Sequence, residues 1–273
     1  MAESFYEPDG DDDGAFVATE LTRGPWDPGH QHAGPPAALI GREVERLGEG
    51  GVGGPGGLPA QVGRLTYEVL RPVPIGPVRV RAEVVRPGRR VEMVAATLSD
   101  GGGEPLMRAQ GWRLRTEPVR FEQPPGIPAA PPGPDAGEPG EYVETPHDAG
   151  YHTAMDYRFL AGAFMEPGPA TVWMRMRVPL LPGEEPTPLQ RVLAAADSGN
   201  GVSAPLDWER YLFINVDLTV HLSRMPRGEW VCLDAVTVPE HEGIGISDTA
   251  LFDESGPIGR AAQTLLVAPR EGD

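Results

Sequence analysis

The chain has 273 residues, of which 40 are acidic and 23 are basic, so its formal net charge is −17. All 23 basic residues are arginine, which excludes chemistry that needs an amine, such as a Schiff base or a lysine-bearing phosphate loop. A charge this negative argues against a nucleic-acid partner, because such binding depends on cationic side chains that contact phosphates. The single cysteine, Cys232, excludes an internal disulfide and a zinc site built from thiolates.

The first 14 residues form an acidic segment that lacks the basic and apolar regions of a signal peptide. No apolar run in the sequence approaches the roughly 20 residues that a membrane helix needs. We therefore expect a solvated tail over about residues 1–14 and a soluble, cytoplasmic protein without membrane insertion.

The first helix is predicted directly after His32 and Gly34. The two prolines at 35–36 suit the first turn of a helix, and apolar residues then recur at helical spacing as far as Leu47. The stretch 48–59 is dominated by glycine and proline and predicts a loop. It is not a phosphate-binding loop, because no lysine follows it.

Segments of alternating apolar and polar residues follow and predict four antiparallel strands within the first 115 residues. Residues 116–145 are rich in proline and glycine, which predicts a linker. The rest of the chain repeats the organisation of the first part. A helix with one apolar face comes first, and four strands follow it. That face comprises Leu189, Val192, Leu193 and Ala196. We expect an N-terminal domain over 1–115 and a C-terminal domain over 146–273.

The two halves are related by an internal repeat at an offset of 153 residues. Without a gap, 11 of the 46 pairs over residues 65–110 are identical, and Gln110 falls on Gln263. Each copy has one helix upstream of consecutive strands joined by short turns. This pattern predicts an α+β fold made of two hotdog modules in tandem, each a curved antiparallel sheet wrapped on one long helix.

The sequence resembles the TesB-like acyl-CoA thioesterases, a family of double-hotdog proteins. The segments that carry the resemblance are HAGPPAALIGREVERL and YEVLRPVPIGPVRVRAEVVRPGRRVEMV in the first half, and HTAMDYR, PLQRVLAAADSGNG, NVDLTVHLSRMPRGEWV and GPIGRAAQTLLV in the second. The resemblance implies hydrolysis of an acyl-CoA to a free acid and CoA, with no cofactor, and is compatible with a homodimer.

In that family a carboxylate, a hydroxyl and a glutamine hold the water that attacks the thioester. The resemblance places the carboxylate at Asp197, the hydroxyl position at Asn215 and the glutamine at Gln263. The family more often has Thr or Ser where this chain has Asn215, and a histidine where it has Leu218.

The chemistry of these residue types suits the implied reaction. Direct attack by water needs a general base, groups that orient the water and donors for the developing oxyanion. A partly buried carboxylate such as Asp197 binds a proton more tightly than a solvated one, and the two amides can hydrogen-bond a water. At the repeat offset, Val44 and Val62 replace Asp197 and Asn215, so we expect one active site per chain. The first half would contribute Gly34, and with it His32, as oxyanion and substrate-binding groups before its helix.

Other interpretations of the same residues stay open at this point. Asp197 could simply end its helix, and the amides could be structural. A non-catalytic acyl-thioester or lipid-binding module is suggested by the departures at Asn215 and Leu218. A hotdog hydratase or dehydratase would need a histidine with an acidic partner, and no segment offers that pair clearly. His30 and His32 are a weak metal signal without a carboxylate nearby, so no metal site is predicted.

Overall fold

The computed structural model describes residues 2–10, 12–47, 59–122, 125–140, 147–164 and 166–270. The predicted glycine-rich loop lies outside these ranges except for its last residue, Pro59. Within them the helices are α1 (Gly34–Arg46), α2 (Tyr151–Ala154), α3 (Pro188–Ala196) and α4 (Gly199–Val202), with short 3-10 turns at Glu20–Thr22 and Pro134–Ala136. None of the described helices combines the length and the apolar character needed to cross a membrane.

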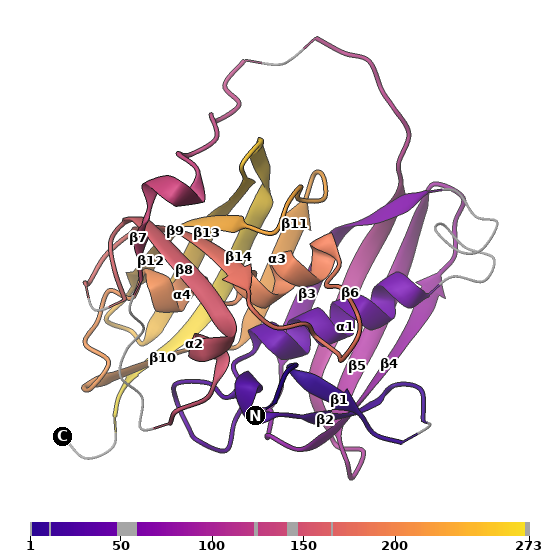
Figure 1. The fold of residues 1–273 in the computed structure, drawn as a ribbon, viewed down its shortest axis with the longest axis horizontal. Helices are drawn as coiled ribbons and strands as arrows, with labels where there is room; N and C mark the ends of the chain where they lie inside the picture. The colour runs from indigo at the N-terminus through magenta and orange to yellow at the C-terminus, as the bar shows by residue number, and fades with distance from the viewer. Residues whose placement is uncertain are drawn as a thin grey trace.

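The strands form one 14-stranded antiparallel sheet that runs through both halves of the chain (Figure 1). The strands are β1 (Tyr6–Pro8), β2 (Ala15–Ala18), β3 (Ala60–Val69), β4 (Pro77–Arg86), β5 (Val91–Asp100), β6 (Pro105–Arg115), β7 (Glu138–Pro139), β8 (Met155–Ala161), β9 (Ala170–Met176), β10 (Tyr211–Asn215), β11 (Asp217–Leu222), β12 (Val231–Pro239), β13 (Ile244–Asp253) and β14 (Gly256–Pro269). Their order is β1-β2-β4-β5-β6-β3-β11-β14-β13-β12-β9-β8-β7, and β10 pairs with β14. The order β4-β5-β6-β3 in the first half is mirrored by β12-β13-β14-β11 in the second, which confirms the double-hotdog fold.

The two modules meet edge to edge through β3 and β11. In this seam Thr66 lies opposite Thr219, its own counterpart at the repeat offset, and the two hydroxyl oxygens are 3.2 Å apart. The local axis that relates the modules therefore passes between these threonines. Each module covers the open edge of the other, so neither strand is left with a row of unpaired backbone groups.

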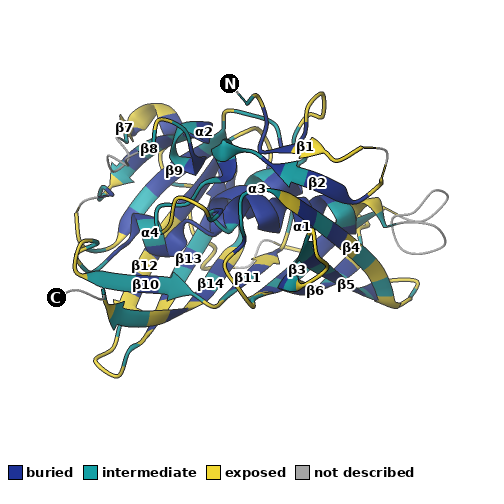
Figure 2. Ribbon diagram, turned by 90° about the horizontal axis from the view of Figure 1, so that it is seen from below, coloured by how far each residue is buried: buried dark blue, intermediate teal, exposed yellow. Residues whose placement is uncertain are grey.

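The two longer helices lie side by side on the same face of this sheet. Figure 2 shows α1 and α3 enclosed in the middle of the molecule. A β-carbon at Gly41 of α1 would stand 2.3 Å from a methyl group of Leu193 in α3. Such close approach depends on the small residues of α1. The helix faces predicted from apolar spacing are buried, including Leu39, Val44 and Leu193.

The N-terminal segment differs from the expected solvated tail. Phe5 and Tyr6 are fully buried, and β1 pairs with β2. The phenol of Tyr6 donates a hydrogen bond of 2.6 Å to the side chain of Gln31. Two adjacent aromatic side chains bury enough apolar surface to hold this acidic segment against the body of the protein. Asp12 and Asp13 beyond them are exposed, as the sequence predicts.

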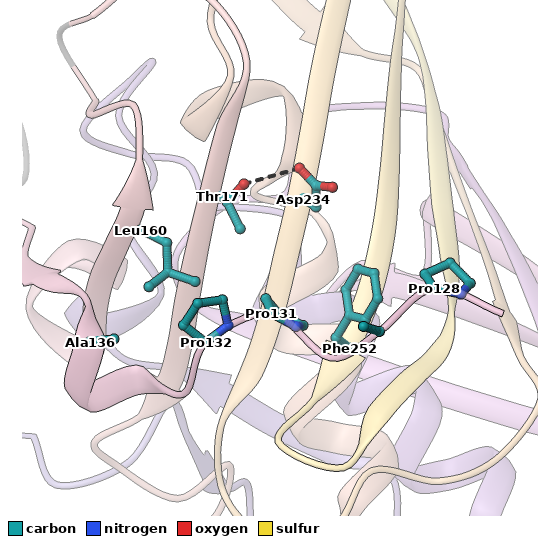
Figure 3. Close-up of a pocket in the computed structure, with 9 residues that line it drawn as sticks. Pro128, Pro131, Pro132, Ala136, Leu160, Thr171, Asp234 and Phe252 are labelled. Carbon is teal, nitrogen blue, oxygen red and sulfur yellow. Dashed lines mark hydrogen bonds between the residues drawn. The ribbon is translucent and has the colours of Figure 1, made fainter. Parts of the chain in front are cut away.

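The second part of the predicted linker, residues 128–140, is docked on the second module, whereas residues 116–122 are exposed. The indole N–H of Trp173 donates a hydrogen bond of 2.8 Å to the carbonyl of Pro132, and β7 pairs with β8. Between this segment and the sheet lies a groove of about 530 Å³ (Figure 3). Phe252 and Leu160 line it together with Thr171 and Asp234, whose side chains are hydrogen-bonded at 3.0 Å. The groove contains none of the predicted site residues.

The turn between β13 and β14 is held by a partly buried ion pair. The side chain of Asp253 is fully buried and accepts two hydrogen bonds from the guanidinium of Arg224 at 2.5 and 2.6 Å. Burial alone would raise the pKa of Asp253, but Arg224 and the backbone N–H groups of Arg227 and Ser255 lower it to about 2. Arg224 therefore has a structural role at this turn.

On the last strand of each module, the pairing of the sheet shows that the repeat is shifted by one residue from the offset of 153. Val94 lies opposite Gly111 in the first module, whereas its counterpart Ser247 lies opposite Gln263 in the second. The structural counterpart of Gln263 is therefore Gly111, not Gln110. A gap-free alignment cannot show this shift, because one residue of difference in the turn before the strand moves every later pair.

Candidate active site

Asp197 stands at the end of α3, where the helix stops against the sheet. The helix begins with a capping box in which the Thr187 hydroxyl accepts from the N–H of Gln190 and the Gln190 side chain accepts from the N–H of Thr187. It ends at Ala196, and Asp197 is its C-terminal cap with a side chain only 4% exposed. A buried carboxylate needs donors around it, and these come from three other segments.

Two amides donate to the same oxygen of Asp197. Asn215 Nδ2 lies 2.8 Å from Asp197 Oδ1, and Gln263 Nε2 lies 3.3 Å from that oxygen and 3.0 Å from the backbone carbonyl of Asp197. Asn215 is the last residue of β10, directly before the break at Val216 that separates β10 from β11. The break falls at the position equivalent to Gly63, where β3 has a bulge. The structure therefore brings the three residues predicted from the second module together.

The orientation of the Gln263 amide is set by α4. Its oxygen Oε1 accepts a hydrogen bond of 3.1 Å from the backbone N–H of Asn200, which leaves Nε2 directed at Asp197. The side chain of Asn200 in turn donates to the carbonyl of Phe213 at 3.1 Å, two residues before Asn215. Asn200 thus links both amide-bearing strands to the helix end. Its role was not predicted, because a backbone donor leaves no side-chain pattern in the sequence.

His32 contacts the second oxygen of Asp197. His32 Nδ1 lies 3.1 Å from Asp197 Oδ2, and the backbone N of Gly34 lies 3.1 Å from the same Nδ1. The sequence offers no clear pairing of a histidine with an acid, and the structure corrects this expectation. The reason is that the partners come from different modules, 165 positions apart. His32 and Gly34 therefore do join Asp197 at one place.

The proton on His32 decides which of its two neighbours it binds. A ring nitrogen that carries a proton donates to Asp197 Oδ2, whereas one that lacks it accepts from the Gly34 N–H. Because the same atom cannot do both, protonation at Nδ1 leaves the Gly34 N–H without that acceptor. Burial lowers the pKa of His32, and the Asp197 carboxylate opposes this shift. Above this pKa the imidazole is neutral.

The first module has no equivalent of this arrangement in its described residues. Val62 occupies the position of Asn215, and Gly111 occupies that of Gln263. Val62 is buried and belongs to the apolar core of its module. Within the described residues, a cluster of a carboxylate, two amides and an imidazole therefore occurs once, built mainly from the second module and completed by the loop before α1.

Other sequence candidates lie apart from this cluster. His30 is 41% exposed, and its Nδ1 lies 3.3 Å from Asp27 Oδ1. Cys232 is buried in β12, and burial, with a smaller contribution from the Asp234 carboxylate, raises the pKa of its thiol to about 12. Among the described residues, no three His, Cys, Asp or Glu side chains are placed to hold a metal ion.

Comparison with protein families gives two matches that together span most of the chain. Residues 22–114 match the model of the acyl-CoA thioesterase N-terminal domain, and residues 124–267 match that of the acyl-CoA thioesterase C-terminal domain. Among curated proteins, none matches the sequence.

Solved structures share the whole fold at low sequence identity. The acyl-CoA thioesterase II TesB2 from Mycobacterium marinum is 17% identical with a TM-score of 0.66, covering 98% of this chain and 96% of that chain. A hot dog fold protein of unknown function from Alicyclobacillus acidocaldarius is 16% identical with a TM-score of 0.69, covering 96% and 95%. The tesB protein of Mycobacterium avium subspecies paratuberculosis is 14% identical with a TM-score of 0.65, covering 96% and 95%.

Proposed function

The chain belongs to the acyl-CoA thioesterase family and is a thioester hydrolase, and from this premise we propose that it cleaves an acyl-CoA by direct attack of water activated by Asp197. The observation that supports the proposal is the hydrogen-bonded carboxylate itself. Two amides of the second module and an imidazole from the first surround Asp197, and Val62 and Gly111 replace the amides at the equivalent positions of the first module.

The lone pairs of Asp197 indicate which oxygen is the base. Oδ1 already accepts from Asn215 and Gln263, which uses both of its lone pairs. Among the described residues, Oδ2 has one polar contact, His32 Nδ1, and so keeps one lone pair for a water. We assign Oδ2 as the proton acceptor and the two amides as the groups that hold the carboxylate, and an adjacent water, in place.

The proposed reaction has two stages. The water oxygen forms a bond to the thioester carbon while its proton passes to Asp197 Oδ2, and the carbonyl π electrons move onto the oxygen. The Gly34 N–H, released when His32 Nδ1 donates to Asp197, is the proposed donor to that oxyanion. The C–S bond then breaks, the thiolate of CoA leaves with the bond electrons, and the proton on Asp197 returns to the sulfur. The products are a carboxylic acid and CoA.

Release of free thiol from a series of acyl-CoAs, from acetyl to palmitoyl, tests this proposal. We expect turnover of at least one member, with CoA and free acid in equal amounts. Binding of every member without release of thiol would instead identify a non-catalytic acyl-thioester-binding protein. Cys232 contributes no background to a thiol assay because it is buried.

The contact between His32 and Asp197 favours a second candidate, a hydratase that adds water to an enoyl-CoA. A histidine with an acidic partner can deliver a proton and activate water in that reaction as well. Incubation with crotonyl-CoA distinguishes the two functions, since addition of water raises the mass of the thioester by one water and leaves the C–S bond intact.

Three finer expectations stay proposals: the domain boundaries at 115/116 and 145/146, a homodimer, and a cytoplasmic location. The outer face of each sheet offers support for the homodimer. It exposes apolar side chains at equivalent positions in the two modules, namely Val85, Val91 and Leu114 in the first and Val238, Ile244 and Leu266 in the second.

A further inference from the structure

Tyr151 touches the imidazole of the site with its ring. The ring centroids of Tyr151 and His32 are 3.8 Å apart and their planes are inclined by 9°, so the two rings are stacked face to face. Tyr151 is 1% exposed, at the first position of α2. The stacked Tyr151 ring hinders tilting of the imidazole, so the imidazole moves mainly within the plane of the imidazole itself. Since Nδ1 lies in this plane, the stacking fixes the direction in which Nδ1 contacts Asp197.

The hydroxyl of Tyr151 contacts the helix end that carries Asp197. It donates a hydrogen bond of 2.6 Å to the carbonyl of Ala194 and lies 3.0 Å from the hydroxyl of Ser198. These residues flank Asp197, three positions before it and one position after it. The hydroxyl thus holds the backbone on both sides of the carboxylate.

We infer that Tyr151 is a positioning residue for the Asp197–His32 pair, which it holds at its working distance by binding both partners at once. The inference rests on the proposed function, in which Asp197 is the base and His32 its neighbour. It assigns Tyr151 no direct contact with substrate. Tyr151 acts through the geometry and the proton affinity of the pair.

The groups that face His32 explain why the ring affects protonation. From α3 it meets the carboxylate of Asp197, from α2 the neutral phenol of Tyr151, and from its own loop the backbone N–H of Gly34. The face of an aromatic ring is electron-rich and attracts a cation. Tyr151 therefore favours the charged imidazolium, in the same direction as Asp197 and against the effect of burial.

Two substitutions separate the hydroxyl from the ring. Tyr151→Phe keeps the stacked ring but loses both hydroxyl contacts, so we expect kcat to fall about tenfold with no change in the pH profile. Tyr151→Leu removes the ring as well. We expect a larger loss of kcat, and the alkaline limb of kcat/KM, set by loss of the His32 proton, should move to lower pH by about half a unit, because the imidazolium loses its aromatic face.

Tyr67→Phe is the matched control. Tyr67 is also fully buried, and its hydroxyl donates 3.0 Å to a helix carbonyl, that of Ala37 in α1. It should lose similar thermal stability with normal kcat and pH profile. If Tyr151→Phe and Tyr151→Leu behave like Tyr67→Phe, losing stability alone, the inference is wrong.

A measurement without turnover keeps this inference separate from the thioesterase mechanism. The pKa of the His32 imidazole can be followed by NMR in wild type and in Tyr151→Leu, with the signal assigned from its loss in His32→Gln. A lower pKa in Tyr151→Leu supports the inference even if no acyl-CoA is hydrolysed, and in that case only the proposed function fails. An unchanged pKa overturns the inference.

Discussion

The substitution Asp197→Asn tests the proposed base with little disturbance of its surroundings. The amide oxygen of the new side chain would take the place of Oδ1 and accept from both Asn215 and Gln263. Its NH₂ group would then face His32 Nδ1, which can accept when it carries no proton. Asn215, Gln263 and His32 each keep a partner, and the feature that disappears is the lone pair of Oδ2 that takes the proton from water.

The expected loss follows from that single change. Removing a positioned general base lowers kcat by about 10²- to 10⁴-fold, which corresponds to roughly 2.7 to 5.4 kcal/mol in the activation barrier. The free energy of unfolding should fall by only about 1 to 2 kcal/mol, because hydrogen bonds to a charged acceptor become bonds to a neutral one. Asp197→Ala is a poorer probe. It removes the oxygens that face Asn215, Gln263 and His32, at about 1 to 3 kcal/mol for any buried donor left unpaired, although the two amides keep the backbone carbonyls of Asp217 and Asp197 as acceptors.

The assay is thiol release under saturating acyl-CoA, combined with urea unfolding of the same two proteins. A kcat within twofold of wild type would refute Asp197 as the base, whatever the stability result. A loss of activity that matches a loss of folded protein would point to a structural role for the carboxylate. The KM value should stay close to that of wild type, because the amide occupies the same space as the carboxylate.

Three further outcomes follow from burial and geometry. Asp253→Asn should cost about 2.5 kcal/mol of stability at pH 7 in urea unfolding. Because the folded pKa is depressed to about 2, this contribution is present above about pH 4 and is lost toward pH 2, where the variant should match wild type. Cys232 should not react with a thiol reagent in the native protein, and one thiol per chain should appear in denaturant, since its pKa is about 12. Gly34→Ala should destabilise by about 1 to 3 kcal/mol, because its β-carbon would stand 2.3 Å from the carbonyl oxygen of Ala194. Gly201→Ala, with nothing within 4 Å, is the control that should keep wild-type stability.

The fold was predictable because its signals are local and occur twice. The prolines at 35–36 and the apolar spacing behind them place α1 at Gly34–Arg46, close to the predicted bounds. Burial of Phe5 and Tyr6 was not predictable in this way, because the acidic residues around them dominate the local composition. The error at Gln110 has a similar origin. Register in a sheet depends on turn length and on the neighbouring strand, and neither can be read from identity at one offset.

The residues of the candidate site that a family motif marks could be predicted from the sequence, whereas the contacts between distant segments could not. Asp197 and Gln263 were assigned from the family resemblance, and the structure places them within hydrogen-bonding distance. The pairing of His32 with Asp197 and the stacking of Tyr151 on His32 join segments more than 100 residues apart. No spacing rule relates such positions, so a single sequence does not show them.

The seam at Thr66 and Thr219, where two related modules pair edge to edge, affects which buried polar residues each module carries. In a symmetric dimer of identical modules, both modules would carry the same buried groups, and each would need hydrogen-bond partners for its own carboxylate and amides. In one fused chain, the two modules can differ in sequence. Val62 and Gly111 can then pack as ordinary core on one side of the axis, while Asn215 and Gln263 take the equivalent positions on the other. The first module is thereby free to bury a different polar pair, Glu92 and Arg113, whose guanidinium also donates to the backbone carbonyls of Val44 and Leu47 at the end of α1. It contributes a loop and a helix start to the site of the second module without repeating that site.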